Sequence, residues 1–73
     1  MKRRRRIASH QILLDNGSLL TRLSVVEILS GVVTDIYPMT EELSQTEWMP
    51  GEIRLTRDAE GQLRAYYNGK IID

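Results

Sequence analysis

The sequence predicts a small all-β protein, and three observations support this. Residues that form tight turns recur at short intervals, the segments between them have the length of strands, and two of these segments alternate cleanly between apolar and polar residues. We expect an antiparallel sandwich or partly open barrel of about six or seven short strands, with at most one helical turn. The turn-forming stretches are 15–18, 30–31, 50–51, 58–61 and 68–69.

The first strand is expected over residues 7–14. Ala8, His10, Ile12 and Leu14 would face one side of a sheet and the residues between them the other side. The apolar end of this segment leads directly into the turn at 15–18.

Residues 19–29 fit both a helical and an extended pattern, because leucine and valine recur at either spacing. The β-branched residues Val25, Val26 and Ile28 favour a strand. A glycine turn at 30–31 then leads into the second apolar run, 32–37, so we expect a hairpin. Pro38 ends its second strand, because proline cannot donate to a ladder.

The segment after Pro38 is harder to assign. Thr40, followed by Glu41 and Glu42, would cap a single helical turn that reaches Leu43. Residues 45–49 form a short extended piece that contains the only tryptophan, Trp48.

The clearest hairpin is expected from 52–57 and 62–67, which alternate around the turn at 58–61. A last strand, 70–72, follows the turn at 68–69. Glu52, Arg54 and Arg64 would face water. The core-facing side chains of this hairpin would be Ile53, Leu55, Leu63, Ala65 and Tyr67.

The length of 73 residues allows one small core, so we expect a single β domain over 7–73 after a basic disordered tail at 1–6. The chain has no cysteine and one histidine, which excludes disulfides and the common zinc sites. The sequence nominates no positioned partner that would make His10 a general base, and the acidic residues Glu41, Glu42 and Glu47 lack the pattern of a calcium loop. We predict no catalytic residue, metal or cofactor.

The net charge of zero conceals two unlike parts. Five of the ten basic residues lie at the amino terminus, so residues 7–73 hold five basic and ten acidic residues, a net charge of −5. The basic run at the amino terminus has three interpretations. It is a disordered, solvated terminus, an arm for nucleic-acid phosphates, or a segment that docks on acidic residues of its own chain or of a second copy. No long apolar run follows it, so we expect a cytoplasmic protein without a membrane span. The basic run is Lys2, Arg3, Arg4, Arg5 and Arg6.

Aromatic residues are few, so we expect Trp48 and the three tyrosines in the core, with an exposed recognition patch as the alternative. Tyr66 and Tyr67 are neighbours on one strand and must point to opposite faces. An exposed Tyr66 together with Arg64 would form a partner surface. A small domain also gains stability by pairing edges, so we expect a protein partner or a homodimer through an edge strand.

The order of features over residues 7–51 is an apolar strand, a turn, the strand 23–28, a glycine turn, the strand 32–37 and then Pro50-Gly51. This order resembles the small β-sandwich at the amino-terminal end of metal-dependent amidohydrolases of the imidazolonepropionase and cytosine-deaminase type. The positions that this family favours for its strand and turn residues hold Glu27-Ile28, Gly31 and Asp35-Ile36.

The chain departs from that family after Pro50-Gly51. There the family enters its catalytic barrel with a His-x-His metal motif, whereas the corresponding positions hold Thr56 and Asp58. A (β/α)₈ barrel also takes about 250 residues. The resemblance therefore implies a free-standing relative of the accessory sandwich, in which residues 52–72 replace strands that follow the barrel, and no catalytic or metal residue carries over.

Three functions follow as hypotheses. The first is a non-enzymatic structural or protein-interaction module. The second is a nucleic-acid-associated protein that uses the basic run. The third is a subunit that completes the barrel of a separate amidohydrolase chain, and that barrel is a C–N bond hydrolase.

Overall fold

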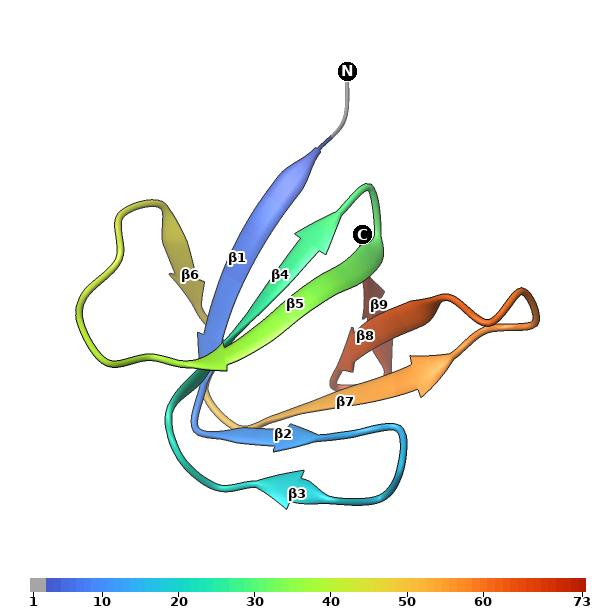
Figure 1. Ribbon diagram of the computed structural model, residues 1–73, viewed down its shortest axis with the longest axis horizontal. Coiled ribbons are helices and arrows are strands. Elements are labelled where there is room, and N and C mark those ends of the chain that lie inside the picture. The colour runs from blue at the N-terminus through green and yellow to red at the C-terminus, as the bar shows by residue number, and fades with distance from the viewer. Residues whose placement is uncertain (1–2) are drawn as a thin grey trace.

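The computed structural model describes residues 3–73, and within them the chain forms nine short strands and no helix (Figure 1). The predicted all-β class is confirmed, although with more strands than six or seven. None of these elements is a helix long and apolar enough to cross a membrane, as far as residues 3–73 are concerned. The strands are β1 (Arg4–Ser9), β2 (Gln11–Leu13), β3 (Leu19–Leu20), β4 (Ser24–Leu29), β5 (Val32–Pro38), β6 (Thr46–Trp48), β7 (Glu52–Arg57), β8 (Leu63–Tyr67) and β9 (Lys70–Ile72).

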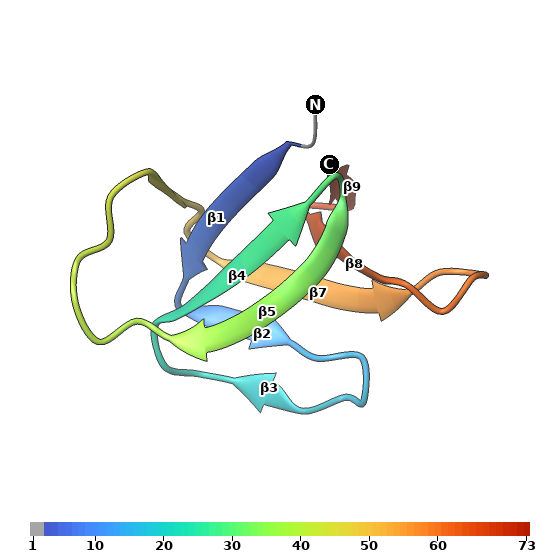
Figure 2. The same ribbon diagram turned by 45° about the horizontal axis from the view of Figure 1, so that its top comes forward.

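The strands form two sheets around one core. Sheet A has the strand order β5-β4-β1-β6, and sheet B has the order β3-β2-β7-β8-β9. Figure 2 shows the strands of sheet A lying across those of sheet B. Most neighbouring strands are antiparallel, as predicted, but β1 pairs with β6 and β2 pairs with β7 in parallel. Both sheets are therefore mixed.

The chain passes from sheet A to sheet B at His10. The prediction of one strand over 7–14 is wrong, because β1 ends at Ser9 and β2 begins at Gln11 in the other sheet. Ile7 and Ile12 are both fully buried, yet residues five apart on a continuous strand point to opposite faces. The break at His10 reverses the alternation and lets both side chains enter the core. At this corner the Ser9 hydroxyl donates a hydrogen bond to the Gly51 carbonyl at 2.7 Å.

Aliphatic side chains from both sheets fill the core. The predicted core positions of the β7–β8 hairpin are confirmed, since Ile53, Leu55 and Ala65 are buried, and Leu63 and Tyr67 pack against them. The remaining buried members of this core are Ile7, Ile12, Val26, Ile28, Val33 and Ile72.

The segment 19–29 is extended, and its second half forms the predicted hairpin with β5. The two turn residues Ser30 and Gly31 have φ angles of 50° and 82°. Two consecutive residues with positive φ define the tight turn whose twist matches that of paired strands. Pro38 ends β5, as predicted.

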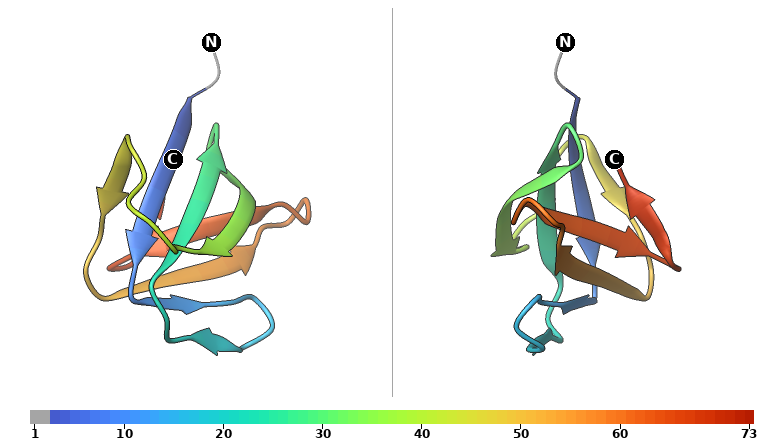
Figure 3. Two further views of the ribbon diagram at one scale, coloured as in Figure 1. Left: turned by 60° about the vertical axis from the view of Figure 1, so that its left-hand side comes forward. Right: turned by 90° about the vertical axis from the view of Figure 1, so that its right-hand side faces the viewer.

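The predicted helical turn over 40–43 is wrong, because residues 39–45 form an irregular connection. This connection joins β5 at one edge of sheet A to β6 at the other, with two strands between them (Figure 3). Neighbouring strands lie about 4.8 Å apart, so the segment must cover roughly 14 Å and is drawn out. One turn of helix also forms too few hydrogen bonds to offset its nucleation.

The expected disordered tail over 1–6 is wrong for residues 4–6, which form the first half of β1. Arg4, Arg5 and Arg6 pair with Leu29, Ile28 and Glu27 of β4. The carbonyl of Arg3 also accepts a hydrogen bond from the Ser30 amide at 2.7 Å. Lys2 lies outside the described residues. The β domain therefore begins earlier than the sequence predicts. The partners of residues 4–6 lie more than twenty positions away, so no local pattern indicates this pairing.

Candidate functional site

A continuous row of side chains crosses the outer face of sheet B, which points away from the core. The pairing register places one residue of each strand directly beside the next: Leu19 beside Leu13, Leu13 beside Arg54, Arg54 beside Tyr66 and Tyr66 beside Ile71. Directly paired residues share one face of a sheet. We call these five residues the sheet B stripe.

The stripe is apolar at both ends and is open to solvent. The exposed fraction is 44% for Leu19 and 47% for Ile71. Both residues have an apolar neighbour, Leu20 and Ile72, that packs in or against the core. Since successive residues of a strand point to opposite faces, each Leu-Leu or Ile-Ile pair must leave one member outside. The doubled apolar residues in β3 and β9 were the signal by which sequence reasoning could have found this surface.

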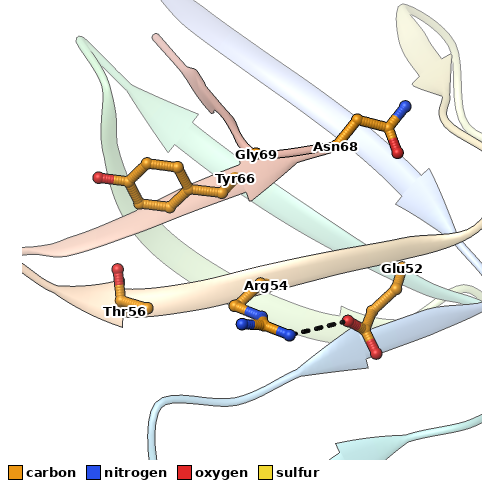
Figure 4. Close-up of a pocket in the computed structure, with 6 residues that line it drawn as sticks. All are labelled: Glu52, Arg54, Thr56, Tyr66, Asn68 and Gly69. Carbon is orange, nitrogen blue, oxygen red and sulfur yellow. Dashed lines mark ion pairs between the residues drawn. The ribbon is translucent and has the colours of Figure 1, made fainter.

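The centre of the stripe lies in a depression of about 560 Å³ (Figure 4). All of its lining residues belong to β7, β8 and the turn that follows β8. An ion pair lies along β7 at one side of it, with the Arg54 guanidinium 3.8 Å from the Glu52 carboxylate. The lining residues are Glu52, Arg54, Thr56, Tyr66, Asn68 and Gly69.

The depression offers an ion pair, a hydroxyl, a phenol and an amide group to a binding partner. Thr56 supplies a hydroxyl group, but no histidine is among the lining residues to act as its base. In the part of the chain that the structure describes, no group of three or more histidine, cysteine, aspartate or glutamate residues could hold a metal ion. The arrangement can hold a partner through charge, hydrogen bonds and aromatic contact.

The two residues predicted as a partner surface, Arg64 and Tyr66, lie on the same face of β8, but only Tyr66 lines the depression. Arg64 instead donates to the Asp58 carboxylate and to the Gly31 carbonyl, each at 2.9 Å, and so joins sheet B to the β4–β5 turn of sheet A. The hydrogen bond from Arg64, helped by the backbone amides of Gln62 and Glu60, holds the pKa of Asp58 below its ordinary value.

Arg5 of the basic run forms a second link between the sheets. Its guanidinium donates two hydrogen bonds to the Glu47 carboxylate, at 2.8 and 2.6 Å, and one to the Asp73 carbonyl at 3.0 Å. The hydrogen bonds from Arg5 lower the pKa of Glu47, and those to Glu47 raise the pKa of Arg5. This contact corresponds to the third interpretation of the basic run, in which it docks on acidic residues of its own chain.

Arg4 and Arg6 share one acidic partner on the outer face of sheet A. Their nitrogens lie 3.4 and 3.3 Å from the two oxygens of Glu27. The Tyr37 hydroxyl donates to the same carboxylate at 2.5 Å, and this hydrogen bond, together with the two arginines, lowers the pKa of Glu27. The hydrogen bond raises the pKa of Tyr37 in turn. Three arginines proposed as nucleic-acid contacts, Arg4, Arg5 and Arg6, thus each have an acidic partner in the same chain, and two of them share one carboxylate.

The expectation that Trp48 lies in the core is wrong, because half of its surface is exposed. Trp48 lies on the edge strand β6, where a side chain on the outer face has a neighbour on one side only. His10 packs against it edge to face, with ring centroids 4.9 Å apart and an interplanar angle of 87°. Of the acidic residues considered for a cation, Glu47 pairs with Arg5, whereas Glu41 and Glu42 are exposed in the β5–β6 connection.

Comparisons with known proteins add no constraint on these surfaces. No family model, no curated protein and no solved structure matches this chain. The candidate site therefore rests on the residues and geometry of the chain itself.

Proposed function

We propose that this protein is a non-catalytic protein-binding module whose contact surface is the sheet B stripe. The observation that supports the proposal is the unbroken row of Leu19, Leu13, Arg54, Tyr66 and Ile71 across all five strands of the sheet. Protein interfaces have this composition, since tyrosine and arginine dominate the residues that contribute most to binding and apolar residues surround them.

The form of the depression also favours a protein over a small molecule. A small-molecule pocket encloses most of its ligand between several elements. Here the lining residues come from a single hairpin and the turn after it, so a ligand would be covered from one side. A broad partner surface can cover the depression and the apolar ends of the stripe together.

Charge is balanced within the site. Glu52 lies beside Arg54 and leaves no net charge in the centre of the stripe. A strongly acidic or basic partner would therefore find no long-range attraction there. A partner of mixed surface composition fits this face best.

Site-specific photocrosslinking tests the proposal without knowledge of the partner. Thr56, in the depression, is replaced by benzoylphenylalanine, and the exposed Thr40 of the β5–β6 connection is replaced in the same way as a matched control. We expect the probe at position 56 to give defined protein adducts that Arg54→Glu abolishes. The proposal fails when position 56 gives no adduct, or when positions 56 and 40 give the same adducts.

A further inference from the structure

We infer that the partner of the sheet B stripe is a second copy of this chain, packed face to face about a twofold axis. This inference rests on the proposed function, because it names the occupant of the same surface. Identical surfaces can pair in this way only when each surface complements itself. The arrangement of residues along the stripe meets that condition.

The self-complementarity follows from the order of the residues across the strands. A twofold axis parallel to the strands, between β7 and β8, exchanges the neighbours Arg54 and Tyr66. Each Arg54 then lies over the ring of the partner's Tyr66, the position in which a guanidinium and an aromatic face attract each other. The contact occurs twice in the dimer.

The same axis brings apolar residues together. Leu13 lies one strand beyond Arg54, and Ile71 lies one strand beyond Tyr66. The rotation therefore places Leu13 opposite the partner's Ile71, again twice. An axis parallel to the strands also keeps the strand directions of the two packed sheets aligned, which is the common geometry of stacked sheets.

Net charge does not oppose association of two copies. The chain has ten basic and ten acidic residues, a formal net charge of zero, so no long-range repulsion separates identical molecules. A standard interface covers about 800 Å² on each partner, which is roughly a sixth of the 4900 Å² accessible surface of this chain. One face of a five-stranded sheet is large enough to bury this area in a dimer.

The other predicted route to a dimer, the pairing of edge strands, is obstructed at β5. The amide of Met39 donates to the Leu23 carbonyl, so by the alternation of an antiparallel ladder the amide of Ile36 points away from β4. That amide donates instead to the Asp35 side chain at 2.9 Å. Pro38 has no amide to offer, and the register shift opposite Glu27 and Ile28 bends the strand. Such features oppose the pairing of another strand at this edge.

Sedimentation velocity over a range of protein concentrations tests the inference. We expect a monomer–dimer equilibrium in the micromolar range, and Arg54→Glu raises the dissociation constant by about thirtyfold. Arg22→Glu makes the same change of charge in the exposed connection between β3 and β4 and leaves the constant unchanged. Adding Tyr66→Lys to Arg54→Glu restores dimerisation, because the two new charges face each other across the axis. Circular dichroism confirms that each variant is folded.

The absence of native cysteine allows a second measurement of the geometry. Copies with Arg54→Cys are mixed with copies with Tyr66→Cys and treated with a short bismaleimide, because facing residues of two stacked sheets lie about 10 Å apart, too far for a direct disulfide. We expect the mixed cross-link to exceed both like-with-like products. A dimer that is insensitive to Arg54→Glu, or equal yields of all cross-links, overturns the inference. A monomer at all concentrations also overturns it. In that case, photoadducts from position 56 to a different protein leave the proposed function intact, and the absence of adducts contradicts both.

Discussion

The outer faces of the two sheets are built from the same residue types but use them differently. On sheet A, Arg4, Arg6 and Tyr37 converge on Glu27, and the neighbouring Val25 is fully buried. On sheet B, the ion pair of Arg54 with Glu52 spans 3.8 Å and both ends of the stripe are exposed. Sheet A gathers its charged groups around one carboxylate, although the Arg6 Nε has no hydrogen-bond partner, whereas sheet B holds one longer ion pair beside exposed apolar side chains.

This difference indicates that the outer face of sheet A serves stability and the outer face of sheet B serves binding. Polar groups that are already paired within the chain contribute to folding and have little left to offer a partner. Exposed apolar residues beside an arginine and a tyrosine contribute little to folding but much to association. Substitutions on sheet A should therefore change the free energy of unfolding, and substitutions on sheet B should change binding.

The largest expected difference is between two truncations. Val25→Ala removes buried methyl groups on sheet A and should lower the free energy of unfolding by about 2 kcal/mol. Ile71→Ala, on the exposed end of the stripe, should lower it by less than about 0.5 kcal/mol. Urea unfolding of dilute, monomeric protein measures both. Equal losses of unfolding free energy in the two variants would show that stability and binding are not divided between the two faces.

A smaller difference is expected for the acidic residues. Glu27→Ala leaves Tyr37 without its acceptor and two arginines without their counter-charge, and should cost about 1 to 2 kcal/mol. Glu52→Ala removes one exposed partner at 3.8 Å and should cost less than about 0.5 kcal/mol. The same unfolding experiment applies. A larger effect for Glu52→Ala would reverse the comparison.

Acid should weaken the links of sheet A. The folded-state pKa values of Glu27 and Glu47 are lowered from 4.5, so their contribution is complete above that pH and is lost as the pH falls through the lower folded values. Solvent screens both groups, and we expect a total loss of about 1 kcal/mol. Unfolding measured at several pH values should show a shallower acid slope for Glu47→Gln than for the wild type, and identical slopes would contradict this.

The smallest expected effect concerns the edge of sheet A. His10→Ala removes the ring that packs against the half-exposed Trp48 and should change the free energy of unfolding by less than about 0.5 kcal/mol. Trp48 is the only tryptophan, so its emission reports this contact directly. We expect the emission maximum of folded His10→Ala protein to move to longer wavelength. An unchanged spectrum would show that His10 does not shield the indole.

The hairpins could be predicted from the sequence because their determinants are local. Ser30 and Gly31 adopt the positive φ angles that their turn requires, and residues 58–61 connect β7 to β8. The same local alternation identified Ile53, Leu55 and Ala65 as core residues. It also placed Arg54 in water and Tyr66 on the face opposite Tyr67, which are two residues of the stripe, and doubled apolar residues such as Ile71-Ile72 mark the ends of the stripe.

The long-range features could not be predicted in the same way. The partners of Arg5 and Arg6 are Glu47 and Glu27, which lie too far along the chain to show in any local pattern. The break at His10 could not be predicted because residues 7–14 contain no proline or glycine that would mark the end of a strand. Only the burial of both Ile7 and Ile12 reveals that the alternation changes sides.

The passage of the chain between the sheets at His10 also has a consequence for folding kinetics. The parallel pairs β1–β6 and β2–β7 bring together residues about forty positions apart, such as Arg6 with Thr46 and Gln11 with Glu52. Neither sheet is complete until the segment that holds β1 and β2 has met the segment that holds β6 and β7. Contacts between segments so far apart in the sequence form slowly. We therefore expect folding on the millisecond-to-second scale in one cooperative step, with amide protons in both sheets exchanging through the same global opening.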